Sequence, residues 1–159
     1  MTRRTSLVAF ALVAAACGAP AEPAPDAPFG SLLAEAPPPP PVDEELAAEG
    51  ERLYLASCAA CHGVDLAGDP NWKIPRDDGT YPPPPHDASG HTWHHPTSQL
   101  VDIVLSGTAE LGGTMPGFAG RLDEEQIRAI LEYFRTTWTS EQRAYQWQAT
   151  WQAEQRDTS

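Results

Sequence analysis

Hydrophobic residues recur with a helical period between residues 123 and 138. The apolar side chains return every three or four positions, at Ile127, Ile130, Leu131, Phe134 and Trp138. This spacing places them on one face of an amphipathic helix. Asp123, with Gln126 three positions later, is typical of a capped helix start. The pattern therefore predicts a helix over 123–138.

Two other segments show shorter helical patterns. Residues 43–57 carry apolar side chains on one face and run directly into a cysteine-containing motif. Residues 98–105 form a second apolar segment, which we expect to be capped by Thr97 or Ser98 and to end at Gly107. No segment alternates polar and apolar residues as paired strands do. We therefore expect an all-α domain.

The first residues of the chain have the pattern of an export signal. Two arginines precede an apolar run over 7–16, which is too short to span a bilayer. Cys17 follows three alanines, an arrangement that resembles the lipobox of bacterial lipoproteins. The resemblance implies a signal peptide over 1–16 and a lipid anchor at Cys17, on the periplasmic side of a bacterial membrane. The alternative is cleavage after Ala16 or Ala19, with no role for Cys17.

Proline dominates residues 17–42. Nine of the 17 prolines lie between Pro20 and Pro41, and the last five of these are consecutive. Such a segment favours extended polyproline II geometry and cannot bury a core. We expect a semi-rigid tether, and the alternative is a docking site for a proline-binding partner.

The charge balance restricts the partners. The chain has 159 residues, of which 10 are basic and 22 are acidic, and its formal net charge is −12. This length suits one small domain with extensions. The excess of acidic side chains argues against nucleic acid or an anionic membrane surface as the main partner. Partner proteins with basic surfaces are favoured instead.

The strongest chemical signal is the sequence Cys58-Ala-Ala-Cys61-His62. Two thiols at this spacing can add across the two vinyl groups of one haem while the adjacent imidazole binds its iron. A structural zinc site would need a second pair of ligands, and no cysteine follows Cys61. A thioredoxin-type redox pair would need a βαβ setting and would not need His62. The motif therefore predicts one covalently bound haem c.

Residues 43–139 resemble a class I c-type cytochrome. The resemblance rests on Gly50, Tyr54 and the cysteine motif, which match the spacing found in the N-terminal helix of that family. It implies three to five helices wrapped around one haem, with the first and last helices crossing closely where Gly50 meets Ile130 and Tyr133. It also implies a mono-haem electron carrier, not an enzyme, that exchanges electrons with a cytochrome, an oxidase or a dehydrogenase.

Met115 is the candidate for the second iron ligand. It lies in the loop Gly112-Gly-Thr-Met-Pro-Gly-Phe118, just before the helix over 123–138. The glycines allow the backbone to fold tightly, and Pro116 stiffens the presentation of the thioether. The loop resembles that of bacterial members of the family, which implies His/Met ligation that closes the iron to substrates.

The resemblance also gives His62 an outer partner. In the family a proline carbonyl accepts the imidazole N–H of the iron-binding histidine, and such a bond orients the ring. Pro70 and Pro75 both follow the motif in the chain. We expect one of these two prolines to take this role.

A histidine-rich stretch lies inside a long insertion over 71–96 that shows no regular pattern. Its candidate side chains are His86, His91, Trp93, His94 and His95. They can surround the haem carboxylates, with Trp93 donating its indole N–H. They can instead bind an added copper or zinc ion, supply the distal ligand, or titrate near the haem. An added ion would indicate metal handling, and a labile sixth ligand would indicate a haem sensor or a peroxidase-like enzyme.

The C-terminal tail over 140–159 is predicted to form a final helix. Trp147 and Trp151 are four positions apart and would share one face of that helix. We expect this face to pack against the domain, and the alternative is a surface that docks a partner.

Overall fold

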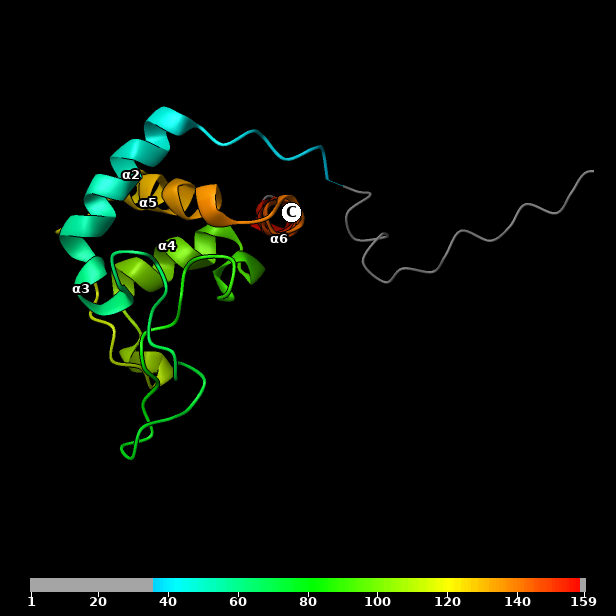
Figure 1. Cartoon of the computed structure of the whole chain (residues 1–159). Helices are drawn as coiled ribbons and strands as arrows, with labels where there is room; N and C mark the ends of the chain where they lie inside the picture. The colour runs from blue at the N-terminus through cyan, green and yellow to red at the C-terminus, as the bar shows by residue number, and fades with distance from the viewer. Residues whose placement is uncertain (1–35, 158–159) are drawn as a thin grey trace, which may run out of the picture.

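The computed structural model describes residues 36–157, whose regular structure is helical (Figure 1). Its α-helices are α2 (Glu44–Ser57), α3 (Ala59–His62), α4 (Thr97–Ser106), α5 (Glu124–Thr137) and α6 (Ser140–Asp157). Two short 3₁₀ helices lie in the loops, η1 (Thr92–His94) and η2 (Ala109–Leu111). Within residues 36–157 the only β interaction is an isolated bridge between Ala119 and Leu122. The predicted all-α class is confirmed.

The N-terminal predictions lie outside this range. The signal peptide over 1–16, the anchor at Cys17 and most of the tether over 17–42 are not among the described residues. The described end of the tether, from Pro37 onward, has no regular structure and leads into α2. None of the helices between residues 36 and 157 is long and apolar enough to cross a bilayer.

Side-chain caps fix the starts of α2 and α5. The Asp43 carboxylate accepts hydrogen bonds from two main-chain N–H groups in the first turn of α2. Asp123 and Gln126 form a capping box at the start of α5, as predicted. Helix α5 ends at Thr137, so Trp138, which we expected in its last turn, is its C-cap residue.

Helices α2 and α5 cross at very short range (Figure 1). A Cβ atom added at Gly50 would lie 1.9 Å from the carbonyl oxygen of Ala129 and 2.9 Å from the nitrogen of Ile130. The glycine is therefore required for the two backbones to approach this closely. One turn later the rings of Tyr54 and Tyr133 lie 5.6 Å apart. The predicted crossing is confirmed.

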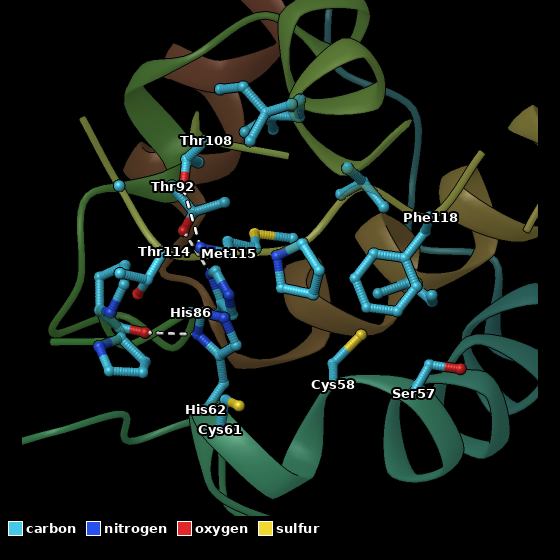
Figure 2. A pocket seen from close by; sticks show the side chains of 18 of the residues that line it. Ser57, Cys58, Cys61, His62, His86, Thr92, Thr108, Thr114, Met115 and Phe118 are labelled. Atoms are coloured by element: carbon cyan, nitrogen blue, oxygen red, sulfur yellow. Dashed lines mark hydrogen bonds between the residues drawn. The ribbon is translucent and has the colours of Figure 1, made fainter. Parts of the chain in front are cut away.

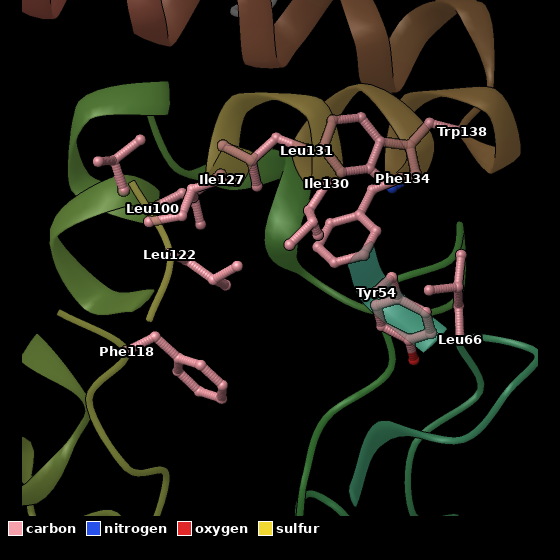
Figure 3. Close-up of a cluster of buried hydrophobic side chains, with 11 residues drawn as sticks. Tyr54, Leu66, Leu100, Phe118, Leu122, Ile127, Ile130, Leu131, Phe134 and Trp138 are labelled. Carbon is pink, nitrogen blue, oxygen red and sulfur yellow. The ribbon is translucent and has the colours of Figure 1, made fainter. Parts of the chain in front are cut away.

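The apolar faces of α2, α4 and α5 meet in one core (Figure 3). Its buried members are Tyr54, Leu66, Leu100, Val101, Phe118, Leu122, Ile127, Ile130, Leu131, Phe134 and Trp138. The predicted hydrophobic face supplies five of them, four within α5 and Trp138 at its C-cap. Trp138 also donates its indole N–H to the carbonyl of His86, 2.9 Å away, which ties the insertion to the core.

The start of α4 differs from the prediction. Pro96 occupies the N-cap position and contributes no side-chain cap. The expected cap by Thr97 or Ser98 is wrong because the Thr97 hydroxyl is engaged with α6. It lies 3.1 Å from the hydroxyl oxygen of Thr150, which also accepts the main-chain N–H of Thr97 at 3.0 Å. The predicted stop at Gly107 is confirmed.

Helix α6 packs against η1 and α4, so the predicted terminal helix is present. The side chains that it buries are mostly polar, and they are Gln146, Gln148, Thr150 and Ala153. Trp147 and Trp151 are only half-buried, and the indole of Trp147 donates to the carbonyl of Pro37 at 2.7 Å. The tail therefore packs on the domain through amides and hydroxyls more than through its tryptophans.

The insertion is irregular, as expected, but main-chain hydrogen bonds fix it. The N–H of Gly68 donates to the carbonyl of His62 at 2.9 Å, and the N–H of His86 donates to the carbonyl of Leu66 at 2.8 Å. Gly68 has φ +60, and a Cβ there would lie 2.5 Å from the carbonyl carbon of Pro84. The chain after the cysteine motif is thereby held against the four consecutive prolines.

Candidate functional site

A cavity of about 490 Å³ opens between α3, α4, α5 and the loop before α5. Cys58, Cys61, His62 and Met115 all line this cavity, although they come from two segments more than 50 residues apart (Figure 2). Most of the remaining wall is apolar and includes Leu100, Val104, Phe118, Ile130, Leu131 and Phe134. The structure thus brings together the four residues to which the sequence assigned chemistry.

His62 is buried at the end of α3, with one nitrogen fixed. Its Nδ1 lies 3.0 Å from the carbonyl oxygen of Pro84. Because a carbonyl only accepts, Nδ1 carries the proton and the lone pair of Nε2 is free to bind a metal. Burial lowers the pKa of His62, and the bond to Pro84 opposes that effect. The expectation of Pro70 or Pro75 as partner was wrong, because the insertion returns Pro84 to the ring.

Cys58 lies at the junction of α2 and α3, and Cys61 lies within the single turn of α3. The main-chain N–H groups of Cys61 and His62 both donate to the carbonyl of Cys58, at 3.1 Å. Cys58 is half-buried and Cys61 is exposed. Burial, followed by the neighbouring Cys61, raises the pKa of the Cys58 thiol to about 11. This turn presents both sulfur atoms beside His62, as the motif predicts.

Met115 is held by a short loop that closes on itself. Its N–H donates to the hydroxyl oxygen of Thr108 at 3.0 Å, and its carbonyl accepts from the N–H of Thr108 at 3.0 Å. At Gly107, which has φ +76, a Cβ atom would lie 2.6 Å from that carbonyl. Thr108 and Gly107 therefore position Met115, and the sequence reasoning had not assigned them this role.

His86 is a cavity residue whose position the sequence did not reveal. Its ring lies 4.3 Å from that of His62 and is stacked 4.5 Å from that of Phe134. Its Nδ1 is 2.8 Å from the hydroxyl oxygen of Thr92. Burial above all, followed by the neighbouring His62 and His91, lowers the pKa of His86 well below its usual value. The imidazole is therefore neutral near pH 7.

These groups fit a haem. One cavity provides apolar walls that suit a planar ligand, together with a free imidazole nitrogen, a thioether and two thiols. Residues 45–134 match the family described as cytochrome c oxidase, cbb3-type, subunit III. The chain belongs to this family of class I c-type cytochromes.

Individual relatives agree with this assignment. Cytochrome c-551 of Halorhodospira halophila is 28% identical over 93 residues, which are 56% of this chain and 99% of that protein. Cytochrome c2 iso-2 of Magnetospirillum molischianum is 31% identical over 88 residues, 50% of this chain and 89% of that protein. The cbb3-type oxidase subunit FixP of Bradyrhizobium sp. (strain ORS 278) is 28% identical over 89 residues, but these are only 26% of its length. No solved structure is significantly similar.

The cytochrome is therefore a mono-haem electron carrier with covalently bound haem c. The match covers 99% of the length of cytochrome c-551, whereas it covers 26% of the length of FixP.

The histidine-rich stretch of this cytochrome divides into two groups. His86, His91 and His95 line the cavity, whereas His94 is exposed and does not. Trp93 is turned away as well, because its indole N–H donates to the carbonyl of Gly90 at 3.1 Å. The expectation that this N–H serves the haem carboxylates was therefore wrong.

An added metal centre finds no geometric support in the described residues. Between residues 36 and 157, no three His, Cys, Asp or Glu side chains gather closely enough to hold an ion. The rings of His91 and His95 do approach each other, at 5.4 Å, but in an edge-to-face arrangement. The described residues therefore do not support the alternative that the histidine-rich stretch binds a copper or zinc ion.

Proposed function

We propose that Cys58 and Cys61 hold the haem through thioether bonds and that His62 and Met115 bind its iron from opposite sides. Residues 43–139 would then be the electron-carrying domain, and 140–159 a helical extension of it. The haem supplies a reversible one-electron couple, and the chain supplies its attachment, its axial ligands and a surface for redox partners.

One observation carries this proposal: four groups that a haem c requires line one cavity. The geometry of His62 supports it further, because its Nδ1–H donates to Pro84 and leaves Nε2 for the iron. The bonds between Met115 and Thr108 support the second ligand, because they restrain the loop that carries the thioether. Methionine ligation raises the potential relative to a second histidine and leaves no open position for a substrate. We therefore infer a carrier and not an enzyme.

The surface charge supports a class of partner. With 22 acidic and 10 basic residues, the chain favours docking against basic patches on a cytochrome, an oxidase or a dehydrogenase. Such docking weakens as salt screens the charges. We expect the rate of electron exchange with the physiological partner to fall as ionic strength rises, and a rate independent of salt would contradict this view.

The location follows from the N-terminal pattern. We propose export by a signal peptide over 1–16, lipid attachment at Cys17 and a tether over 17–42 that keeps the haem domain away from the membrane surface. Mass spectrometry of the mature N-terminus tests this: a diacylglyceryl adduct on Cys17 is expected. A mature chain that begins after Ala19 would remove the anchor.

The axial assignment is tested by the visible spectrum of Met115→Ala. We expect the oxidised variant to lose the weak long-wavelength band of an iron–thioether bond, while the haem remains covalently attached. Thr114→Ala is the matched control, because it truncates the exposed neighbour in the same loop and should retain the band. A band that persists in Met115→Ala would show that another residue is the ligand.

The covalent assignment needs a separate test. Cys58→Ser and Cys61→Ser should each leave one thioether, and the double variant should release haem under denaturing conditions. Intact-mass measurement distinguishes these states, because each covalently loaded chain carries the added mass of one haem. Covalent haem in the double variant would contradict the proposal.

A further inference from the structure

Two segments outside the matched family region meet in the structure. The match covers residues 45–134, so it leaves out the proline-rich tether before it and helix α6 after it. The indole Nε1–H of Trp147, in α6, donates to the carbonyl oxygen of Pro37, in the tether, at 2.7 Å. This bond joins residues 110 positions apart. It connects two additions to the cytochrome domain with each other.

The chemistry of the two partners is complementary. Residues 37–41 are five consecutive prolines. Proline has no main-chain N–H, and extended polyproline II geometry makes no internal hydrogen bonds. The carbonyl oxygens of such a segment therefore need donors from elsewhere, and an indole N–H is a group that only donates. Domains that recognise proline-rich peptides likewise bind them against aromatic side chains.

The proline segment is also fixed at its other end. The N–H of Asp43 donates to the carboxylate of Glu132, in α5, at 2.9 Å. Asp43 lies six residues after Pro37, and polyproline II rises about 3.1 Å per residue, so the stretch between them can span about 19 Å. In Figure 1 this stretch runs from the start of α2 toward α6. One end is therefore bound to α5 and the other to α6.

The stiffness of the segment allows few bonds to hold it. The side chains of residues 37–41 are exposed, so docking buries little apolar surface. A run of prolines has few conformations to lose when it docks, whereas a flexible segment of the same length would lose more conformational entropy. The bond to Trp147 should therefore depend on the proline content of the tether.

Helix α6 is itself held firmly where it carries this tryptophan. Gln146, the preceding residue, is buried, and its amide donates to the hydroxyls of Thr97 and Thr150, both at 3.0 Å. Trp147 is only half-buried, so its indole lies at the edge of this contact and can reach the tether. The helix thus binds the domain through its amides and the tether through an indole.

We propose that Trp147 of α6 is a binding site for a proline-rich segment and that residues 37–41 of the same chain occupy it. Docking fixes the direction in which the tether leaves the domain, on the side of α6. In Figure 1, α3, which carries Cys61 and His62, lies on the other side of the domain. The inference goes beyond the proposed function and requires neither the lipid anchor nor an assignment of the axial ligands.

The experiment measures hydrogen exchange of the indole N–H groups by NMR in the haem-loaded, ferrous full chain. The chain has five tryptophans, and the Trp147 signal is identified by its absence in Trp147→Phe. A second chain has residues 37–41 replaced by alternating glycine and serine, which keeps the length of the tether and removes its stiffness. We expect the Trp147 indole to exchange about twofold more slowly in the wild type than in this chain.

A matched control removes prolines elsewhere in the tether. Pro20→Ser, Pro23→Ser, Pro25→Ser and Pro28→Ser, made together, leave residues 37–41 intact. This chain should retain the slow exchange of the Trp147 indole. Fast exchange in the control would overturn the inference, because the protection would then not depend on the docked segment.

A double-mutant cycle tests the pairing through stability. Trp147→Phe should shift the folding equilibrium about twofold in the wild type and leave it unchanged in the chain with the glycine and serine replacement. Trp151→Phe, which removes an indole one turn later, should have the same effect in both chains. An equal effect of Trp147→Phe in both chains would overturn the inference.

Two further results would contradict the intramolecular contact. Equal exchange rates of the Trp147 indole in the wild type and in the replaced chain would show that no proline segment is bound there. Slow exchange that disappears on dilution would show that the tether of a second copy occupies the site. The mass of the same samples reports covalent haem separately, so each of these failures would leave the proposed function standing.

Discussion

The α2–α5 crossing and the contact of α6 with the insertion join distant parts of the chain by opposite means. At the crossing, Gly50 lets two backbones approach until a single added carbon would lie 1.9 Å from an oxygen. The surrounding contacts are aromatic and aliphatic. The ring of Tyr54, from α2, packs against the rings of Tyr133 and Phe134, from α5. This region depends on the volume of its side chains and uses few directional bonds.

The contact of α6 depends on directional bonds. The Gln146 amide donates to the hydroxyls of Thr97 and Thr150, both at 3.0 Å, and its oxygen accepts from Arg135 at 2.7 Å. Arg135 continues to Glu132, whose other oxygen accepts the N–H of Asp43 at 2.9 Å. The start of α2 is thereby linked through α5 to α6 by one partly buried polar network.

The two regions should therefore tolerate different substitutions. The crossing should accept changes of chemistry that conserve volume and reject any added bulk. The α6 contact should accept changes of volume at its edge and reject the loss of one partner, because each loss leaves a buried polar group unsatisfied. Four predictions probe this difference, in order of decreasing effect.

Gly50→Val should be the most damaging change. Its Cβ would collide with the Ala129 carbonyl, and we expect the free energy of unfolding to fall by about 3 kcal/mol. Ala48→Val adds the same kind of side chain to the exposed face of the same helix and should cost about 0.5 kcal/mol. Denaturant titration of the haem-loaded proteins measures both values. Equal losses in the two variants would refute the close crossing.

Gln146→Leu tests the polar network with a side chain of similar size. It removes the partners of Thr97, Thr150 and Arg135, so we expect a loss of about 2 kcal/mol. Gln152→Leu, on the half-buried part of the same helix, should change the free energy of unfolding by less than about 0.5 kcal/mol. If Gln146→Leu left the free energy of unfolding unchanged, packing and not hydrogen bonding would hold α6 on the domain.

The pH dependence of stability tests His86 in the insertion. Its pKa is well below the usual value of 6.5, chiefly because of burial, whereas the unfolded chain titrates normally. Below about pH 6.5 the unfolded state binds more protons than the folded state. The free energy of unfolding should therefore decrease as the pH is lowered, by up to about 1.4 kcal/mol for each pH unit. His86→Gln should reduce this slope, and His94→Gln, at an exposed site, should change it less. An unchanged slope in His86→Gln would rule out its burial as the cause.

Trp147→Phe tests the end of the tether and should have the smallest effect. It removes the indole N–H that donates to the carbonyl of Pro37, which is exposed, so we expect a loss of about 0.5 kcal/mol. Trp151→Phe makes the same truncation one turn later on the half-buried surface of α6. The difference between the two free energies of unfolding isolates the bond to Pro37, and a zero difference would show that the bond adds no stability.

The sequence predicted helix α5 better than it predicted the path of the insertion, for a physical reason. Helical periodicity and capping residues are local signals, and they located α5 to within one residue at its C-terminal end. The choice of Pro84 over Pro70 or Pro75 depends on how the insertion folds back, which no local pattern records. The pairing of Thr97 with Thr150 joins residues 53 positions apart and likewise has no local signal.

By itself, the sequence determined the helical class and the local spacing of Cys58, Cys61 and His62, because both depend on patterns within a few turns, whereas the close approach at Gly50 was expected from the resemblance to class I c-type cytochromes. Tertiary structure alone decided which carbonyl orients His62, which histidines face the cavity and that α6 supports the loop between them. These outcomes depend on the path of an irregular segment, whose conformation is set by hydrogen bonds to distant elements and not by its own residue pattern.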